Sequence, residues 1–209
     1  MNYQVVLDET LKNLSGKKKL LLHACCAPCS SYVIEYLSEY FDITILYYNP
    51  NIDTEDEFNL RLSELERFVK SFKIKNEVKV VSLGYDNQEY LDEIKGLESE
   101  KEGGRRCLKC YHLRLLKSCL YAKENNFDYF TTTLTISPLK NSRILNEIGH
   151  ELESEYGINY LYSDFKKKEG YKRSIVLSRE FNLYRQDYCG CKFSKNRGSL
   201  SSRVGGTKN

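Results

Sequence analysis

The sequence predicts an α/β fold in which helices cover a parallel, Rossmann-like sheet. Short runs rich in β-branched and aromatic residues alternate with segments of helical period along most of the chain, and this alternation is typical of parallel sheets. The length of 209 residues suits one domain. A hydrophobic content of 41% and a charged content of 29% are ordinary for a soluble globular protein and exclude a largely disordered one.

The first predicted strand lies between two predicted helices. Residues 3–14 are amphipathic and stop before Gly16, and glycine commonly follows the end of a helix, so we expect a helix there. The apolar run at 17–24 predicts a strand. Residues 25–30 are expected to form a loop, and residues 31–40 resume at helical period.

Two further strand–helix pairs follow in the first half of the chain. Residues 42–50 predict a second strand that stops at an Asn-Pro pair, and residues 55–72 predict a helix with one apolar face. Residues 77–85 predict a third strand, and residues 87–99 predict the next helix.

The second half of the chain continues the alternation. Residues 105–126 predict a long helix, residues 128–135 predict a fourth strand before a Ser-Pro pair, and residues 141–157 predict a helix capped by its final glycine. The last predicted elements are a fifth strand at 158–164, a charged loop at 166–172 and a helix at 174–188. We therefore predict a single α/β domain at 1–193 and a flexible basic tail at 194–209, which lacks apolar periodicity.

The charge of the chain argues against a strong general attraction to nucleic acid. The formal net charge is +3, and the predicted tail contributes four basic residues and no acidic one, so the rest of the chain is near neutral. Any affinity for nucleic acid must therefore come from local patches. We expect a cytoplasmic protein without a membrane partner, because no apolar run approaches the ~18 residues of a membrane span and the N-terminus does not resemble a secretory signal.

Two unusual segments adjoin predicted strands. HACCAPCS begins at the end of the first strand, and TISPLKNS begins at the end of the fourth. The carboxyl ends of parallel strands meet at one edge of the sheet, and ligands bind at this edge in open α/β folds. We therefore expect both segments to contribute to one functional site.

Seven of the eight cysteines lie in three short clusters. The clusters are Cys25, Cys26 and Cys29; Cys107 and Cys110; and Cys189 and Cys191. Closely spaced cysteines in a reducing compartment are typical of metal ligands or redox catalysts. The eighth, Cys119, stands alone in an apolar helical pattern and is predicted to be a core residue.

Three interpretations of the clusters compete. Structural zinc needs four ligands, which the two Cys-x-x-Cys pairs could supply, but 77 residues separate the pairs and three clustered cysteines stay unused. A thioredoxin-like dithiol oxidoreductase would use Cys26 and Cys29, between a strand and a helix, and leave the other clusters idle. An iron–sulfur cluster bound by four thiolates, with the remaining cysteines in redox chemistry, employs all seven.

The spacing within two clusters bears on the choice among these three interpretations. Adjacent cysteines such as Cys25 and Cys26 point to opposite sides of an extended chain, so they suit the separated irons of a cluster better than one zinc ion. Cys189 and Cys191, separated by a glycine, could close a strained disulfide of the labile, catalytic kind. They could equally bind a second metal.

Four segments together resemble the QueH family of epoxyqueuosine reductases. They are HACCAPCS, RCLKCYHLRL, TTTLTISPLKN and EGYKRSIVLSREFNLYRQDYCGC, which occur in family order over most of residues 20–193. The resemblance implies an adenine-nucleotide α-hydrolase (HUP-type) α/β fold. It also implies an oxidoreductase that reduces the epoxide of epoxyqueuosine to queuosine at the wobble position of tRNAs with GUN anticodons. No ATP is implied, and the sequence contains no glycine-rich phosphate loop.

The resemblance further implies roles for the clustered cysteines. The residues that match those assigned to a 4Fe-4S cluster are Cys25, Cys26, Cys107 and Cys110. Cys189 and Cys191 match a redox-active pair, and Cys29 is a candidate ligand of a second, mononuclear iron. Two arrangements stay open: Cys29, Cys189 and Cys191 bind that iron together, or Cys189 and Cys191 cycle as a disulfide.

Deoxygenation of an epoxide takes two electrons and two protons, so the implied activity needs an external electron donor and nearby proton donors. Asp187 beside the last cysteine cluster and His23 beside the first are the candidate catalytic side chains. The candidate RNA contacts are basic residues in or next to the motif segments, namely Arg105, Arg106, Lys140, Lys172 and Arg173. Two alternative functions stay open: a thioredoxin-like dithiol oxidoreductase, and a non-enzymatic zinc or iron–sulfur protein that binds RNA.

Overall fold

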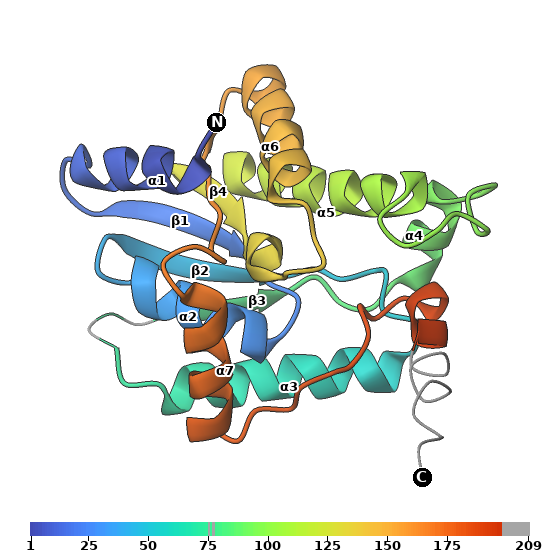
Figure 1. Cartoon of the computed structure of the whole chain (residues 1–209). Helices are drawn as coiled ribbons and strands as arrows, with labels where there is room; N and C mark the ends of the chain where they lie inside the picture. The colour runs from blue at the N-terminus through green and yellow to red at the C-terminus, as the bar shows by residue number, and fades with distance from the viewer. Residues whose placement is uncertain (75, 77, 198–209) are drawn as a thin grey trace, which may run out of the picture.

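The computed structural model describes residues 1–197 except 75 and 77, and these residues form an α/β fold around a five-stranded parallel sheet (Figure 1). The strands are β1 (Lys18–His23), β2 (Phe41–Tyr47), β3 (Lys79–Ser82), β4 (Tyr129–Thr132) and β5 (Asn159–Tyr160). Their order in the sheet is β3-β2-β1-β4-β5, and every neighbouring pair is parallel. This is the strand order of a Rossmann-type sheet, so the predicted fold class is confirmed.

Helices cover both faces of the sheet. They are α1 (Tyr3–Lys12), α2 (Ala27–Leu37), α3 (Glu55–Ser71), α4 (Asn87–Glu93), α5 (Arg105–Glu124), α6 (Ser142–Tyr156) and α7 (Gly170–Glu180), with the 3-10 helices η1 (Thr133–Ile136) and η2 (Lys192–Arg197). Helices α2 and α3 pack on one face, and α5 and α6 pack on the other (Figure 1). None of the helices in the described part of the chain is long and apolar enough to cross a membrane.

Strand β1 lies at the centre of the sheet and connects its two cores. Leu20 and Leu22 belong to the core shared with α2 and α3, whereas Leu21 belongs to the core shared with α5 and α6. This alternation follows from the two-residue period of a strand. Because both faces are covered, the middle of β1 is a continuous apolar run of three leucines, as expected for a central parallel strand.

The predicted elements are present, but two of their boundaries near the cysteines differ. Helix α2 begins at Ala27 instead of residue 31, because Pro28 occupies its first turn, where proline is favoured. Cys29 is therefore helical and does not lie in a loop. Strand β4 ends at Thr132, whose hydroxyl accepts a hydrogen bond from the Leu134 N–H and starts η1 where we expected more strand.

The carboxyl-terminal part of the chain differs more from the predicted elements. The predicted fifth strand is reduced to two residues, and α7 ends at Glu180. Asn182 then adopts a positive φ of 48°, which breaks the helix, so the chain beyond it runs to the cysteine pair as irregular backbone. Residues 194–197 belong to η2, and residues 198–209, most of the predicted basic tail, lie outside the described residues.

The contact between α7 and α2 at Gly170 yields a testable prediction. A β-carbon at Gly170 would lie 2.2 Å from the Phe165 carbonyl oxygen and 2.3 Å from the ring of Tyr32 on α2. We expect Gly170→Ala to lower the free energy of unfolding by about 1–3 kcal/mol, because the two helices must separate to admit the methyl group. Urea titration followed by circular dichroism measures this change.

Val176→Ala is the matched control for this prediction, because Val176 lies on the same helix and is 41% exposed. It should change the free energy of unfolding by no more than about 0.5 kcal/mol. Equal stabilities of the two variants would show that close packing at Gly170 does not position α7.

Candidate functional site

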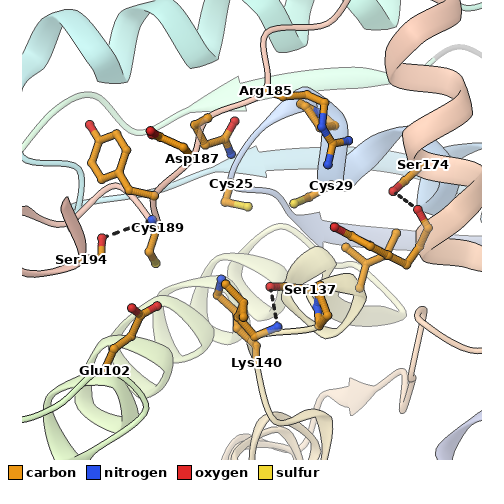
Figure 2. A pocket seen from close by; sticks show the side chains of 17 residues that line it. Cys25, Cys29, Glu102, Ser137, Lys140, Ser174, Arg185, Asp187, Cys189 and Ser194 are labelled. Carbon is orange, nitrogen blue, oxygen red and sulfur yellow. Dashed lines mark hydrogen bonds between the residues drawn. The ribbon is translucent and has the colours of Figure 1, made fainter. Parts of the chain in front are cut away.

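The candidate site is a cavity at the carboxyl edge of the sheet. The segments after β1 and β4 meet there, and the segment that leads from α7 to η2 crosses them. The cavity has a volume of ≈ 190 Å³ and is lined by Cys25, Cys29, Lys140, Asp187 and Cys189, among others (Figure 2). The expectation that HACCAPCS and TISPLKNS contribute to one site is therefore confirmed.

The first cysteine cluster forms a compact group of sulfurs. The sulfurs of Cys25, Cys26 and Cys29 lie within 4.8 Å of one another, and no other set of three potential metal ligands in the described residues is as close. Cys26 precedes the first residue of α2, and Cys29 lies in its first turn. The positive end of a helix dipole and its free N–H groups stabilise thiolates at such positions.

The geometry of Cys25 and Cys26 differs from our prediction. Their sulfurs lie 3.7 Å apart instead of pointing to opposite sides. The chain bends at Cys25 before it enters α2, so the alternation of an extended strand does not apply. Two adjacent cysteines can therefore serve one compact centre here.

The three thiols of this group differ in acidity. Hydrogen bonds from Cys26 and Cys29 lower the pKa of Cys25, with further help from the positive charges of Lys140 and Arg114. The contact with Cys25 raises the pKa of Cys26 to about 12 and also raises the pKa of Cys29. Cys25 is therefore the thiol of this group that loses its proton most readily, and a bound metal ion would displace the protons of the other two.

The remaining four clustered cysteines form a second group between α5 and the carboxyl-terminal segment. Cys107 and Cys110 lie in the first turns of α5, and Cys110 packs in a small core with Cys191. Burial raises the pKa of Cys107 and raises that of Cys110 to about 12, and the charges of Cys189 and Cys191 add to both shifts. All eight cysteines are free thiols. The four predicted cluster ligands are therefore divided between two groups of thiols.

Arg114 on α5 connects the two groups. Its side chain is 1% exposed; Nη1 donates to Asn49 Oδ1 at 3.4 Å, and Nε donates to the Cys110 carbonyl at 3.4 Å. Asn49 in turn donates to the Ala24 carbonyl at 2.9 Å, immediately before Cys25. The side-chain Nη2 of Arg114 has no hydrogen-bond partner among the described residues.

The buried guanidinium of Arg114 lacks a carboxylate partner among the described residues. A buried charge is costly unless it is paired, and no carboxylate in the described part of the chain forms an ion pair with this guanidinium. Burial by itself would lower the pKa of Arg114, but the nearby thiols of Cys110, Cys189 and Cys25 raise it above its usual value. The orphaned Nη2 and the many soft sulfur donors fit an anionic metal–thiolate centre.

The last cysteine cluster is fixed by contacts with the loop after β2 and with α3. The Asp53 N–H donates to the Gly190 carbonyl at 3.0 Å, and buried Arg61 donates to the Cys189 carbonyl at 3.4 Å. Glu57 orients Arg61 through a hydrogen bond of 2.7 Å. Ser194 accepts from the Cys189 N–H at 3.2 Å (Figure 2) and donates to the Cys191 carbonyl at 2.8 Å.

The two candidate catalytic side chains occupy different environments. Asp187 lines the cavity beside Cys189. His23 is fully buried; its Nδ1 lies 2.8 Å from Thr132 Oγ1 and its Nε2 lies 3.1 Å from the Tyr48 carbonyl. Burial lowers the pKa of His23 to about 3, so its ring is neutral. Both ring nitrogens are therefore engaged by the protein, and they connect the end of β1 with the end of β4 and with the residue after β2.

The five candidate RNA contacts differ in exposure and in location. The side chain of Arg105 is 75% exposed, and Lys172 on α7 is equally exposed. Arg173 pairs with Glu35 on α2, and Lys140 lies in the cavity wall. Arg106 corrects our prediction: it is buried, donates to the carbonyls of Glu98 and Glu100, and lies over the ring of Phe193. It stabilises the turn before α5 and is not an accessible RNA contact.

Several residues that organise the site are not evident from the sequence. Arg114 and Arg61 look like ordinary charged positions of amphipathic helices, and Asn49 in the sequence indicates only the end of a strand. A helical-wheel projection that placed Arg114 on the same face as Cys110 would have indicated its burial. No local pattern indicates that Arg61 contacts a cysteine 128 residues further along the chain.

Comparisons with known proteins give one family name. The family model described as epoxyqueuosine reductase QueH matches residues 20–197. A protein of Streptococcus pyogenes serotype M1 named epoxyqueuosine reductase QueH is 42% identical over 199 residues, which cover 93% of this chain and 78% of that protein. A protein of the same name from Staphylococcus aureus strain Mu50 is 41% identical, over 92% of this chain and 85% of that protein.

The backbone at Gly190 yields a second prediction. Gly190 has a φ of +113°, and a β-carbon there would lie 3.1 Å from Ile52 and 3.2 Å from Arg61 Nη1. We expect Gly190→Ala to lower the free energy of unfolding by about 1–3 kcal/mol, because backbone strain and the crowding of Arg61 act together. Thermal unfolding measures the loss.

Gly84→Ala is the control for Gly190→Ala. Gly84 has a φ of +83°, but a β-carbon there would meet nothing within 4 Å, so this variant isolates backbone strain. A loss of stability no larger in Gly190→Ala than in Gly84→Ala would show that the cysteine pair does not depend on close packing against Arg61.

Proposed function

The chain belongs to the QueH family of epoxyqueuosine reductases, and on that premise we propose how its residues reduce epoxyqueuosine to queuosine in tRNA. It is an oxidoreductase of queuosine biosynthesis. The substrate we propose is a tRNA with a GUN anticodon that carries epoxyqueuosine at the wobble position. An interpretation as a thioredoxin-like dithiol oxidoreductase or a non-enzymatic RNA-binding protein is not favoured by this membership.

One observation supports the chemistry above all others: thiols from distant parts of the chain line one cavity. Cys25 and Cys29 enter it from the start of α2, and Cys189 enters it from the carboxyl-terminal segment (Figure 2). Reduction of an epoxide needs electrons delivered close to the reacting carbons, and a cavity walled by thiols fits that need.

We propose that the chain binds an iron–sulfur centre through the cysteines of α2 and α5. The four ligands we assign to a 4Fe-4S cluster are Cys25, Cys26, Cys107 and Cys110. Cys29, whose sulfur lies within 4.8 Å of the first two, is the candidate ligand of a second iron. When bound, such a centre supplies single electrons and iron that can polarise an oxygen atom. Arg114 compensates part of its negative charge.

The other residues of the cavity handle electrons and protons. We assign Cys189 and Cys191 as the redox-active pair, which gives up two electrons and two protons when it becomes a disulfide and regains them from an external donor. Asp187, beside Cys189, is positioned to exchange protons with substrate or with that pair. His23 stays neutral and holds the loop of the first cysteines in place.

Entry of an anticodon base into this cavity requires that the base leaves its stack. Arg105 and Lys172, which are exposed, are the candidate phosphate contacts that would hold the anticodon loop during this step. Because tRNA and its modification occur in the cytoplasm, we infer a cytoplasmic location. The electron donor we propose is a protein or small molecule of low potential that acts from outside the chain.

Substitution of one cysteine tests this function. We expect Cys189→Ser to reduce turnover of epoxyqueuosine tRNA by roughly 100-fold or more, because the redox-active pair is lost while the cluster ligands stay in place. Mass spectrometry of nucleosides from the treated tRNA measures conversion, and an iron assay verifies that metal is retained.

Cys119→Ala is the matched control, since Cys119 is buried on α5 among core side chains and does not line the cavity. It should retain turnover within about two-fold of the unmodified enzyme. Full turnover in Cys189→Ser with unchanged iron would contradict the role assigned to Cys189.

The RNA contacts are tested by the salt dependence of binding. We expect Arg105→Gln and Lys172→Gln each to weaken tRNA binding and to reduce the slope of log affinity against log salt by about 0.9 or less, because each loses one phosphate contact. Fluorescence anisotropy between 50 and 200 mM salt, roughly the range in which such contacts weaken, measures the slope. Arg143→Gln on α6, whose side chain is 77% exposed, is the control and should leave the slope unchanged. Unchanged slopes in Arg105→Gln and Lys172→Gln would show that the RNA does not contact these two residues.

A further inference from the structure

Lys140 lines the cavity and is half-buried. It follows η1 in the segment after β4, where its N–H donates to the Ser137 carbonyl at 3.2 Å. The Ser137 hydroxyl accepts a hydrogen bond from the Leu139 N–H at 3.3 Å, and Asn141 caps the start of α6. Figure 2 shows Lys140 on the wall across from Cys25, Cys29 and Cys189. A tight turn and a helix cap thus fix the backbone that carries this lysine.

The ammonium group of Lys140 has no partner among the described residues. Asp187, which also lines the cavity, forms no ion pair with it. Two other cations lie nearby: Lys166 Nζ pairs with Asp164 at 2.9 Å and donates to the Thr135 carbonyl at 2.8 Å, whereas Arg185, which lines the same cavity, donates to the neutral Ser178 Oγ at 3.1 Å. Lys140 therefore presents free N–H donors to whatever enters the cavity.

The surroundings keep this group charged. Burial by itself would lower the pKa of Lys140, but the thiols of Cys189 and Cys25 raise it above its ordinary value. A cation held next to electron-donating sulfurs occupies the place where negative charge would develop on a substrate reduced there. Fixed donors at such a place are among the largest contributions to catalysis.

We propose that Lys140 is a catalytic residue that donates a hydrogen bond to the epoxide oxygen as this oxygen leaves the substrate. The proposal rests on the epoxyqueuosine reductase activity proposed above. In the complete reaction, both carbon–oxygen bonds break and a carbon–carbon double bond forms. The external donor supplies two electrons, solvent supplies two protons, and the oxygen leaves as water. Lys140 stabilises the oxygen when the first carbon–oxygen bond breaks and ends the cycle in its original protonated form.

This assignment differs from a phosphate contact in measurable ways. A phosphate contact would strengthen binding of every tRNA and contribute to the salt dependence of binding. A contact with the epoxide oxygen acts only on tRNA that contains this oxygen, because the product queuosine lacks it. Comparison of tRNA with epoxyqueuosine and tRNA with queuosine therefore separates the two roles.

The test uses Lys140→Met, which removes the donor, and Lys140→Arg, which keeps a cationic donor. We expect Lys140→Met to slow single-turnover reduction by about 10²–10³-fold, the usual cost of a lost donor to a developing oxyanion. It should weaken binding of epoxyqueuosine tRNA to the oxidised enzyme but not of queuosine tRNA. The salt slope, iron content and sulfide content should stay unchanged, and Lys140→Arg should recover part of the rate.

Lys123→Met is the control, because Lys123 is exposed near the carboxyl end of α5 and does not line the cavity. An equal loss of affinity for both tRNAs with a smaller salt slope would make Lys140 a phosphate contact and overturn the proposal. Loss of iron, or a rate close to that of the Lys123→Met enzyme, would also overturn it. If the unmodified enzyme reduced no epoxyqueuosine with any donor, the proposed function itself would fail.

Discussion

Buried Arg61 joins the beginning of the fold to its end, and the site depends on this connection. Its guanidinium is oriented by Glu57 on α3 and donates to the Cys189 carbonyl. Together with the hydrogen bond from Asp53 to the Gly190 carbonyl, it holds the carboxyl-terminal cysteines against the edge of the sheet. The segment after α7 is irregular backbone, so the place of Cys189 relative to Cys25 depends on tertiary contacts such as these.

Charge gives the same site its chemical character. Arg114 and Lys140 lie among the thiols, and neither pairs with a carboxylate of the described residues. Such an arrangement is costly when the thiols are protonated, because buried charges need compensation. It becomes favourable when several thiols are deprotonated and bound to metal, since thiolate ligands concentrate negative charge there. These cations therefore lower the stability of the fold unless thiolates neutralise their positive charge.

The fold could be predicted from the sequence because periodicity and burial coincide along most of the chain. The run at β1 is apolar on both faces and α3 has one apolar face, so local pattern and tertiary environment agree. Around the cysteines they disagree. Helix α2 begins at Ala27, inside the expected loop, and α7 ends at Glu180, earlier than expected, so Cys29 and Cys189 lie where local pattern did not place them.

The residues of the site could be predicted only in part, because local pattern does not show contacts between distant segments. The cysteine clusters stand out by spacing alone, and their position after strands indicates the sheet edge. The partners that fix them do not stand out, because Arg61, Asn49 and Arg114 act across contacts between distant segments. Lys140 and Arg106 show the limit most clearly: both looked like RNA contacts, and the structure places one in the cavity and buries the other.

The central claim is that the clustered thiols form an iron–sulfur centre, and metal analysis of the anaerobically purified protein tests it most directly. Iron, zinc and acid-labile sulfide are measured together with the absorbance spectrum. We expect about four irons and four sulfides per chain with absorbance near roughly 400 nm, and a further iron if Cys29 serves a second site. Zinc without labile sulfide, even after anaerobic reconstitution, would contradict this account of how the chain reduces epoxyqueuosine.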